Sequence, residues 1–371
     1  MQAYPVVPEA SVWWLSQGWF VLGGVLLFLA ASMSLRKWGG HIIRAYRPRR
    51  LLLGSAQEFV PATDPFRKLA PRAVRVLGNA PLVVGLLLTG AIMVTLVAPQ
   101  LLAPYGPEDT GKTLQVVNGK VTARPFPPSP PYPMGADLRG RDLLSRLLYG
   151  TRRTLSLCFA VAALRLAIGM MLGGVSGWKG GVVGQQILSF GAVSSSIPSL
   201  LFAFLFILAI GPINGFGVFL MGLGLTGWAE FTNTVNAAVR WVRRQPYMEG
   251  ALAVGSTPSH IVGRHMLPNI MPQLLPAIAL EISAVLLTLG ELGFLGVFLG
   301  ESFAGFVPQT IRTPVLPEWA GMLSGARLSF FQWPWLTLSP ALVFLVAIVW
   351  LNLLAIGLRT YLDPMQERLR R

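Results

Sequence analysis

The sequence predicts an all-α membrane protein, and three observations support this fold class. Of the 371 residues, 53% are hydrophobic and only 12% are charged, whereas about a quarter of the residues of a soluble domain are charged. Several apolar runs reach the roughly 20 residues that a helix needs to cross about 30 Å of hydrocarbon. These runs are continuous and do not alternate with polar residues, so helices rather than barrel strands satisfy the backbone inside the bilayer.

The net charge of +15 is consistent with this class. In a soluble protein it would indicate nucleic acid as a partner. Here the arginines flank apolar runs, where they meet anionic lipid headgroups, and no basic segment interleaved with base-stacking aromatic residues lies outside those runs. We therefore expect membrane lipid as a partner and no nucleic acid. The single cysteine, Cys158, falls within an apolar run and is expected to be a core residue.

The first apolar run covers about residues 12–33, and basic residues follow it but do not precede it. A secretory signal has its positive charge on the other side of the apolar run. We therefore expect residues 1–35 to form an uncleaved extra N-terminal transmembrane helix with the N-terminus outside. Residues 36–79 are then a basic cytoplasmic linker.

A second span is predicted over residues 80–102, followed by an outer loop over 103–134 that is rich in proline near its end. In residues 137–153, leucines at helical spacing alternate with arginines, which predicts an interfacial helix with one apolar face. Five more spans follow at about residues 155–177, 182–210, 216–239, 272–296 and 335–358. The total is seven spans, which places the C-terminus in the cytoplasm; the arginines of 137–153 then lie outside, against the usual bias.

The polar and basic segment at residues 246–268 predicts a short helix, a turn and a second short helix. Gly255 suits the left-handed position just past the first helix. Thr257 can cap the second helix and Pro258 can open it. Pro268 is expected to end that helix before the next span. The result is a compact helical knob, which suits docking on another protein.

Charged and kink-forming residues within the spans are candidates for the translocation path. Four charged residues fall within or near predicted spans, namely Arg165, Glu230, Glu281 and Glu291. Such charges cost several kcal/mol unless they are paired or hydrated, so a polar wall of the path is one interpretation. The alternative is a structural ion pair of Arg165 with one of the glutamates. Pro198, in a serine-rich stretch, kinks an apolar helix and forms either a gate or a static bend.

No motif in the sequence indicates an enzyme active site. Residues 106–113 match the phosphate-loop pattern, but a membrane span precedes them and strand or coil follows, whereas the phosphate loop joins a buried strand to a helix. His41, His260 and His265 lack metal-ligand spacing, and no nucleophile is paired with a base. We expect no catalytic, cofactor-binding or metal site on this chain.

Several stretches, in order, carry a family resemblance. They are residues 132–146 (YPMGADLRGRDLLSR), the segment 249–268, residues 291–296 (ELGFLG) with 317–323 (PEWAGML), and residues 358–364 (LRTYLDP). With them the chain resembles the membrane permease subunits of dipeptide/oligopeptide-type ABC importers, the inner membrane components of binding-protein-dependent transport systems. The resemblance covers roughly residues 80–365.

The resemblance implies a six-helix type I ABC importer permease core within residues 80–371, beside the extra N-terminal helix. It implies a non-catalytic subunit that forms half of a translocation pathway for peptides or similar small solutes. Its implied partners are a second homologous permease subunit in a heterodimer, two ABC ATPase subunits that bind ATP and Mg, and an extracytoplasmic solute-binding protein. The location is the bacterial or archaeal cell (inner) membrane.

The resemblance also makes residues 246–268 a coupling loop that docks on an ATPase subunit and drives alternating access. The residues expected to act there are Glu249, Gly250, Ala251, Gly255, His265, Leu267 and Pro268. Glu249 is expected to make a charged contact and Ala251 to allow close approach. Gly250 stands where the family usually has alanine, which loosens the first helix by roughly 1 kcal/mol or less, and His265 stands where an aliphatic residue is common.

Two other functions are weighed against the importer. An ion-coupled secondary transporter would use the intramembrane glutamates as coupling sites, but such transporters usually carry internal repeats, and no convincing repeat is found. A membrane hydrolase would need a nucleophile–base or metal constellation. The substrate and the role of residues 1–79 stay open.

Overall fold

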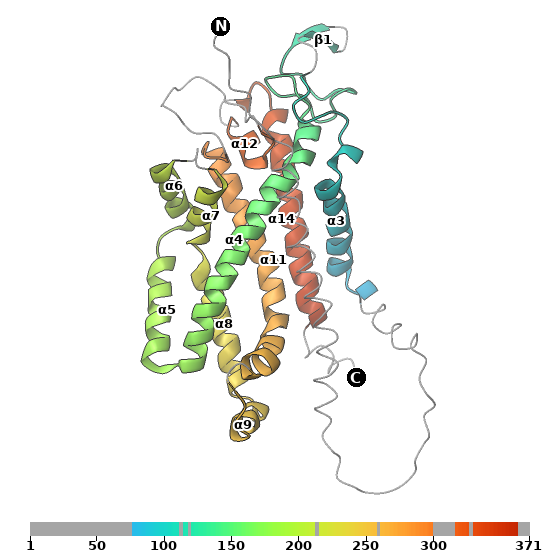
Figure 1. Cartoon of the computed structure of the whole chain (residues 1–371). Coiled ribbons are helices and arrows are strands. Elements are labelled where there is room, and N and C mark those ends of the chain that lie inside the picture. The colour runs from blue at the N-terminus through green and yellow to red at the C-terminus, as the bar shows by residue number, and fades with distance from the viewer. Residues whose placement is uncertain are drawn as a thin grey trace, which may run out of the picture.

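Long helices that run between two opposite ends of the molecule dominate the computed structural model (Figure 1). The described residues are 76–110, 114–117, 120–211, 215–257, 260–299, 316–325 and 329–362. The predicted N-terminal helix, nearly all of the basic linker and the last nine residues lie outside them.

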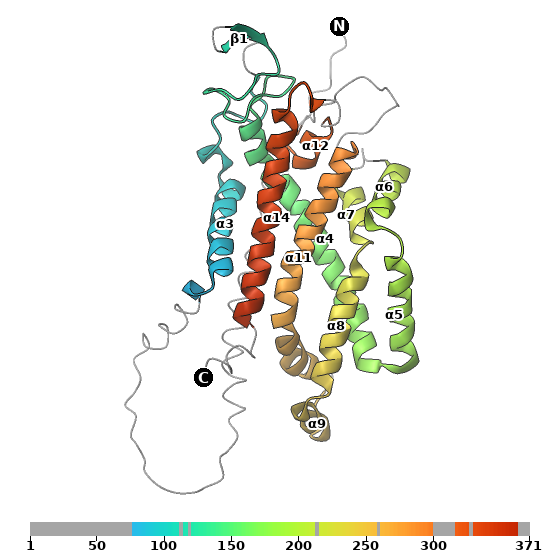
Figure 2. The ribbon, with the colours of Figure 1, turned by 180° about the vertical axis from the view of Figure 1, so that it is seen from behind.

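The chain passes back and forth between the two ends in the order of its elements. The first part comprises α3 (Ala80–Val97), η2 (Pro99–Leu101), β1 (Leu114–Val117), β2 (Lys120–Ala123), α4 (Leu143–Lys179), α5 (Gly181–Ser195) and α6 (Ser199–Ile210). The second part comprises α7 (Phe216–Gly224), α8 (Trp228–Arg243), α9 (Pro246–Ala253), η4 (Ile261–Met266), α11 (Leu267–Phe294), α12 (Trp319–Leu323) and α14 (Trp335–Leu362). The hairpin of β1 and β2 lies at one end and α9 at the other (Figures 1 and 2).

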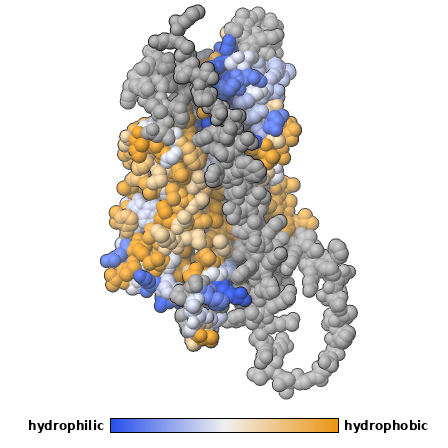
Figure 3. All heavy atoms as spheres, viewed as in Figure 1, coloured by the Kyte–Doolittle hydropathy of each residue, from blue (hydrophilic) through white to orange (hydrophobic). Residues whose placement is uncertain are grey.

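The prediction of a helical membrane protein is confirmed for the described residues, with the antiparallel β1–β2 hairpin as an addition. Four helices are long and apolar enough to cross a membrane, namely α3, α4, α11 and α14, and the bent pair of α5 and α6 makes five if it counts as one span. Figure 3 shows an apolar band between two polar ends on the face it displays.

The separate interfacial helix predicted over residues 137–153 is wrong. The helix begins only at Leu143 and continues without a break to Lys179. Asp142 caps its start, because its Oδ2 accepts hydrogen bonds from the Ser145 backbone N–H at 2.8 Å and from the Ser145 hydroxyl at 2.6 Å. At about 1.5 Å per residue α4 is roughly 55 Å long, so it can extend beyond the hydrocarbon.

Two predicted spans are broken helices. The span predicted over 182–210 bends by 77° between α5 and α6. The break falls at Pro198, as predicted, and the Ser195 and Ser196 hydroxyls donate to the backbone carbonyls of Gly191 and Ala192. The span predicted over 216–239 is also divided, at residues 225–227 between α7 and α8, with Gly227 at a φ of 70°. That second break was not expected from the sequence.

One apolar core joins most of the spans. It is formed by buried side chains of α4, α6, α7, α11, α12 and α14, such as Leu157, Phe219, Leu286 and Trp350. Hydrogen bonds also join α3 and the residue before it to α14. The Asn79 side chain donates to the Gly357 carbonyl at 2.9 Å, and the Trp350 indole donates to the Thr89 hydroxyl at 2.8 Å.

The closest helix contact of α4 is with α8, and glycines spaced four residues apart make it possible. A Cβ atom on Gly169 would lie 2.4 Å from the Phe231 Cβ, and one on Gly177 would lie 2.8 Å from the Val239 Cβ. Gly173 lies between them in the same row. Small residues at this spacing let helix backbones approach closely inside a membrane.

We expect Gly173→Ala to destabilise the protein and Gly174→Ala to leave it unchanged or more stable. A Cβ on Gly173 would lie 2.6 Å from the Thr232 carbonyl oxygen, so α8 must shift at a cost of roughly 1–3 kcal/mol. Nothing lies within 4 Å of a Cβ on Gly174, where alanine gains up to about 1 kcal/mol of helix propensity. Thermal unfolding of both purified variants in detergent checks this. Equal melting temperatures would contradict the close packing of α4 on α8.

Candidate functional site

The predicted knob is present at the end of the molecule opposite the β hairpin. There α9 protrudes beyond the ends of α4, α8 and α11 (Figures 1 and 2). The chain enters it directly from α8 and leaves it through η4 into α11. Two long helices therefore converge on this one short segment.

The turn after α9 has the geometry predicted from the sequence. Gly255 has a φ of 77°, in the left-handed region. The Ser256 N–H donates to the Ala251 carbonyl at 3.1 Å, across the glycine, as in a Schellman motif. The hydroxyl of Thr257 accepts the His260 N–H at 3.4 Å, so Thr257 caps the second helix as predicted.

The prediction that Pro268 ends the second short helix is wrong. Residues Ile261–Met266 form a π-helical turn that continues directly into α11 at Leu267. The Leu267 N–H donates to the Val262 carbonyl five residues earlier. Pro268 then falls in the first turn of α11, where a missing N–H is tolerated. The second arm of the knob is therefore one continuous rod with α11.

A second apolar cluster fixes the knob to the helices beside it. Its buried members are Val235, Ala238, Val239 and Val242 of α8, Met248 of α9, Ile261 and Met266 of η4, and Ile270 and Leu274 of α11. Met248 is fully buried, so α9 cannot move without its neighbours. Arg243, at the end of α8, donates to the Trp178 carbonyl and lies 5.7 Å from the centre of the Trp178 ring. The knob is therefore clamped to α4, α8 and α11.

The outer surface of the knob is free to bind. Glu249, Gly250 and Gly255 are exposed, and Ala251 is half-buried. Val254 is 86% exposed, although it is apolar and stands at the turn after α9. Val254 was not among the residues predicted to act here. The sequence alone does not show that this valine is exposed, because its exposure depends on the geometry of the turn in which it lies.

Of the intramembrane charges, the structure brings Arg165 and Glu281 together. The two side chains form a buried ion pair between α4 and α11. Arg165 also donates to the Leu223 carbonyl, at 2.9 Å from Nε and 2.6 Å from Nη2, and to the Thr226 hydroxyl at 2.7 Å. This is the structural ion pair that the sequence left as an alternative.

The Arg165 guanidinium hydrogen-bonds to the backbone and a side chain at the break between α7 and α8. The Leu223 carbonyl there accepts from the N–H and the hydroxyl of Thr226, and the guanidinium donates to it as well. A Cβ on Gly227 would lie 2.5 Å from Arg165 Nη1, so this position leaves no room for a side chain. Leu223, Thr226 and Gly227 were missed in the sequence, because periodicity does not reveal which carbonyls a distant arginine will reach.

The other predicted path residues form no hydrogen bond or ion pair with Arg165 or Glu281 among the described residues, although the charge of Glu230 lies near enough to act on Glu281. Glu230 is exposed in the first turn of α8, and Pro198 is exposed at the break between α5 and α6. Glu291 is exposed near the end of α11 and borders an apolar groove of about 520 Å³ that is also lined by residues of α6, α12 and α14.

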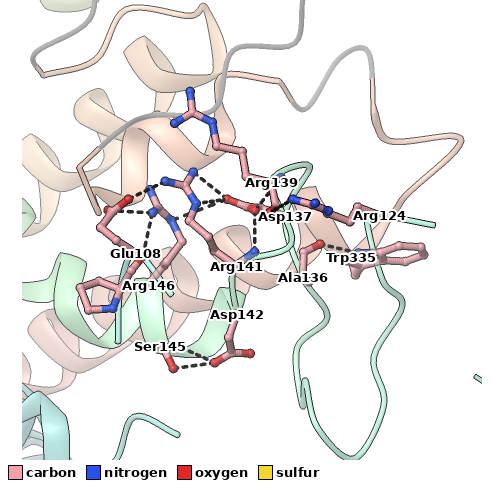
Figure 4. A network of polar contacts seen from close by, with 11 residues as sticks. Glu108, Arg124, Ala136, Asp137, Arg139, Arg141, Asp142, Ser145, Arg146 and Trp335 are labelled. Atoms are coloured by element: carbon pink, nitrogen blue, oxygen red, sulfur yellow. Dashed lines mark hydrogen bonds and ion pairs between the residues drawn. The ribbon is translucent and has the colours of Figure 1, made fainter. Parts of the chain in front are cut away.

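The opposite end is held by a network of buried arginines (Figure 4). Arg141 pairs with Asp137 at 2.7 Å and with Glu108 at 2.9 Å, and Arg146 pairs with Glu108 at 3.1 Å. Arg141 and Arg146 are each 1% exposed. Nearby, Arg152 donates to the last carbonyls of α3, those of Leu96 and Val97. Arg141 and Arg146 tie the loop before α4 to that helix and have their charges paired with carboxylates, while Arg152 ties α4 to α3.

The PEWAGML stretch folds back into the same end. The Trp319 indole donates to the Leu147 carbonyl of α4 at 2.8 Å. Glu318 is 1% exposed, and its Oε2 accepts the Leu299 N–H at 3.0 Å. Burial raises the pKa of Glu318 to about 8, while the Leu299 hydrogen bond and the charge of Arg153 act in the opposite direction. This short segment joins α4, α11 and α14.

The segment that matches the phosphate-loop pattern lies at the hairpin end, away from α9. Its described part follows η2 and consists of turns, in which Asp109 accepts the Gly106 N–H at 2.7 Å. Residues 111–113 lie outside the described residues. Cys158 is fully buried in the core, as predicted. Among the described residues, no group of three or more His, Cys, Asp or Glu side chains could hold a metal ion.

Comparison with known proteins gives a consistent result. The family described as "Binding-protein-dependent transport system inner membrane component" matches residues 168–368. The dipeptide transport system permease protein DppC of Bacillus subtilis is 29% identical over 253 residues, which cover 68% of this chain and 75% of that protein. The protein of the same name from Haemophilus influenzae is 29% identical over 278 residues, or 73% and 86% of the two chains. The oligopeptide transport system permease protein OppC of Bacillus subtilis is 26% identical over 238 residues, or 64% and 73%.

Proposed function

Because this chain belongs to the family of binding-protein-dependent transport system inner membrane components, we propose that it forms half of an ATP-driven translocation pathway for peptides or similar small solutes. It is a multi-pass membrane permease. The peptide class comes from its relatives, whose names are dipeptide and oligopeptide transport permeases. The second half of the pathway is a homologous permease subunit in a heterodimer. An extracytoplasmic solute-binding protein delivers the solute.

One observation carries this proposal, namely the way the α9 knob is built into the helices. Its tip is exposed, Met248 anchors it in the cluster between α8 and α11, and η4 makes it continuous with α11. A partner that moves the tip therefore moves two membrane helices. The partners are two ATPase subunits, which bind ATP and Mg and carry out the hydrolysis that this chain does not. Their ATP-bound state favours one spacing of the two knobs of the heterodimer and so one opening of the pore.

The distribution of arginines supports an orientation with α9 in the cytoplasm. Arg240, Arg243 and Arg244 lie at that end beside Lys179 and are exposed. At the other end Arg141, Arg146 and Arg153 are buried, and the first two pair with carboxylates. Paired arginines do not act as free positive charges, so the conflict with the positive-inside tendency is reduced to Arg139, which is exposed, and Arg152, which donates to backbone carbonyls. Counting α7 with α8 as a sixth, divided span beside the five found, an additional N-terminal helix over residues 1–35 makes seven crossings and places the C-terminus inside.

The geometry disfavours an ion-coupled secondary transporter. The Glu281 carboxylate is already held by Arg165, so it is not a free coupling site. Glu230 and Glu291 lie on different helices and border different surfaces.

Reconstitution tests the proposed function directly. The chain is purified with its partner permease and ATPase subunits and placed in liposomes, and the cognate binding protein is added with labelled di- and tripeptides. We expect uptake that requires ATP, both ATPase subunits and the binding protein. Uptake driven by an ion gradient with the ATPase subunits omitted would overturn the proposal.

A further inference from the structure

The helix that leads into the knob, α8, has two very different faces. One face is buried against α4 and α11 through Phe231, Thr232, Val235, Asn236, Ala238, Val239 and Val242. The opposite face is exposed and runs through Glu230, Asn233, Ala237, Arg240 and Arg244. These five positions are spaced alternately by three and four residues, so they form one straight row on the helix surface. The row is called the α8 stripe below.

The α8 stripe lies at membrane depth. The 16 residues of α8 span about 24 Å, most of the hydrocarbon thickness. Figure 2 shows α8 between α11 and α5, leading from the break after α7 down to α9. Its neighbours α4 and α11 are long and apolar enough to cross a membrane, whereas α8 has only 16 residues and carries Glu230, Arg240 and Arg243.

The polar side chains of the stripe have no hydrogen-bond or ion-pair partner among the described residues. Asn236, on the buried face, donates to the Ser176 hydroxyl at 2.7 Å. By contrast, the side chains of Glu230, Asn233, Arg240 and Arg244 make no hydrogen bond or ion pair with the described residues. Charged side chains facing lipid cost several kcal/mol each and occur in membrane helices mainly where they face a water-filled cavity or a polar partner. The stripe therefore does not face lipid.

On the premise of the proposed permease function, we propose that the α8 stripe lines the aqueous translocation path on the α9 side of the membrane, and that Glu230 attracts the cationic amino group of the passing solute. A path is favoured over a static contact because the stripe is continuous from the middle of the bundle to the exposed base of the knob. The stripe is also carried by a helix that the knob moves, so its surroundings change with the state of the partner.

The charges along the stripe change sign. Glu230 lies at the end near the start of α8, and Arg240 and Arg244 lie at the α9 end. The ten residues from Glu230 to Arg240 correspond to about 15 Å along the helix. The nearby positive charge of Arg165 is already paired with Glu281. Glu230 therefore gives that end of the stripe a negative potential, which favours an ammonium group.

Thiol labelling of the whole complex tests the location of the stripe. The only cysteine of this chain, Cys158, is fully buried, so the label carried by this chain in each single-substitution variant is read against a silent background. The test variants are Asn233→Cys and Ala237→Cys. The matched control is Ile356→Cys, which is 52% exposed on α14. Ile356 and Ala237 each lie six residues before the end of their helix (362 − 356 and 243 − 237).

In inverted vesicles without nucleotide, a membrane-impermeant methanethiosulfonate should label both test variants at least about ten-fold faster than Ile356→Cys, since a thiol in lipid is not ionised. A non-hydrolysable ATP analogue should slow the labelling. Rates no faster than the control would overturn the proposal, because the stripe would then face lipid or the second permease subunit. Fast labelling that is indifferent to nucleotide would also overturn it, because the stripe would then be a static wet surface.

The role of Glu230 is tested by reagent charge. At Asn233→Cys, the ratio of the rates with a trimethylammonium and a sulfonate reagent should fall several-fold when Glu230→Gln is added. An unchanged ratio would show that Glu230 does not set the local potential. ATP-driven peptide uptake is measured in parallel with the unlabelled wild-type complex. Failure of that uptake would concern the permease function itself, and failure of the labelling pattern would concern only the α8 stripe.

Discussion

Val254→Asp is expected to abolish most ATP-driven uptake while leaving the permease folded. Val254 is 86% exposed at the turn after α9, so its replacement removes no contact within the chain. In the proposed docked state this apolar tip enters a site on an ATPase subunit, and an aspartate there would be buried without a partner. Central apolar anchors of this kind dominate interface energies. We expect ATPase binding to weaken by at least about ten-fold, as measured by co-purification and by uptake in proteoliposomes.

Val254→Ile provides the matched control, because it keeps the apolar tip and the β-branched shape. It should retain normal binding and uptake. The melting temperature of the isolated permease should be the same for both variants. Wild-type uptake by Val254→Asp would show that the tip of the knob does not dock. A lowered melting temperature would show instead that Val254 contributes to folding, contrary to its exposure.

Arg165→Leu is expected to be among the most destabilising single substitutions in this chain. It leaves the buried Glu281 carboxylate without a counter-charge and removes the guanidinium donor of the Leu223 carbonyl, which keeps only the hydroxyl and N–H of Thr226. Breaking one side of a buried ion pair typically costs about 3–5 kcal/mol. The yield of folded protein and the melting temperature in detergent should both fall sharply.

The double variant Arg165→Leu with Glu281→Leu separates the cost of an unpaired charge from the value of the pair. Replacing both partners by apolar residues should recover much of the lost stability, although the break between α7 and α8 still lacks its donor. Arg139→Leu serves as a control, because Arg139 is exposed and its side chain should matter little for folding. A double variant no more stable than Arg165→Leu would mean that Arg165 acts mainly through the break and not through Glu281.

The knob shows how far local sequence rules reach. Gly255 and Thr257 were predicted in their observed roles, because a left-handed turn and an N-cap depend on a few neighbouring residues. Pro268 was misassigned for the same reason. Proline is compatible with both the end of one helix and the first turn of another. The π-helical turn that selected the second outcome depends on packing against α8.

The residues at 137–153 show a second limit. Leucines among arginines predicted a helix lying on the membrane surface, since free arginines avoid hydrocarbon. In the structure Arg141 and Arg146 are buried and paired with Asp137 and Glu108. The pairing with Glu108 reaches back 33 residues, and no periodicity in the sequence reveals it. Because these charges are paired, the residues from Leu143 onward can form the first turns of the long helix α4 and need no separate helix on the membrane surface.

By itself, the sequence determined the membrane class, most of the long apolar helices and the existence of a protruding segment between two of them. These features follow from hydrophobic length and from turn chemistry, which act over neighbouring residues. Only the tertiary structure decided which charges meet, where α8 begins and which of its faces stays exposed. Those outcomes depend on contacts between helices distant in the chain, such as Arg165 with Glu281 and Gly173 with Thr232, and the energy of a buried charge is set by the partner that the fold brings to it.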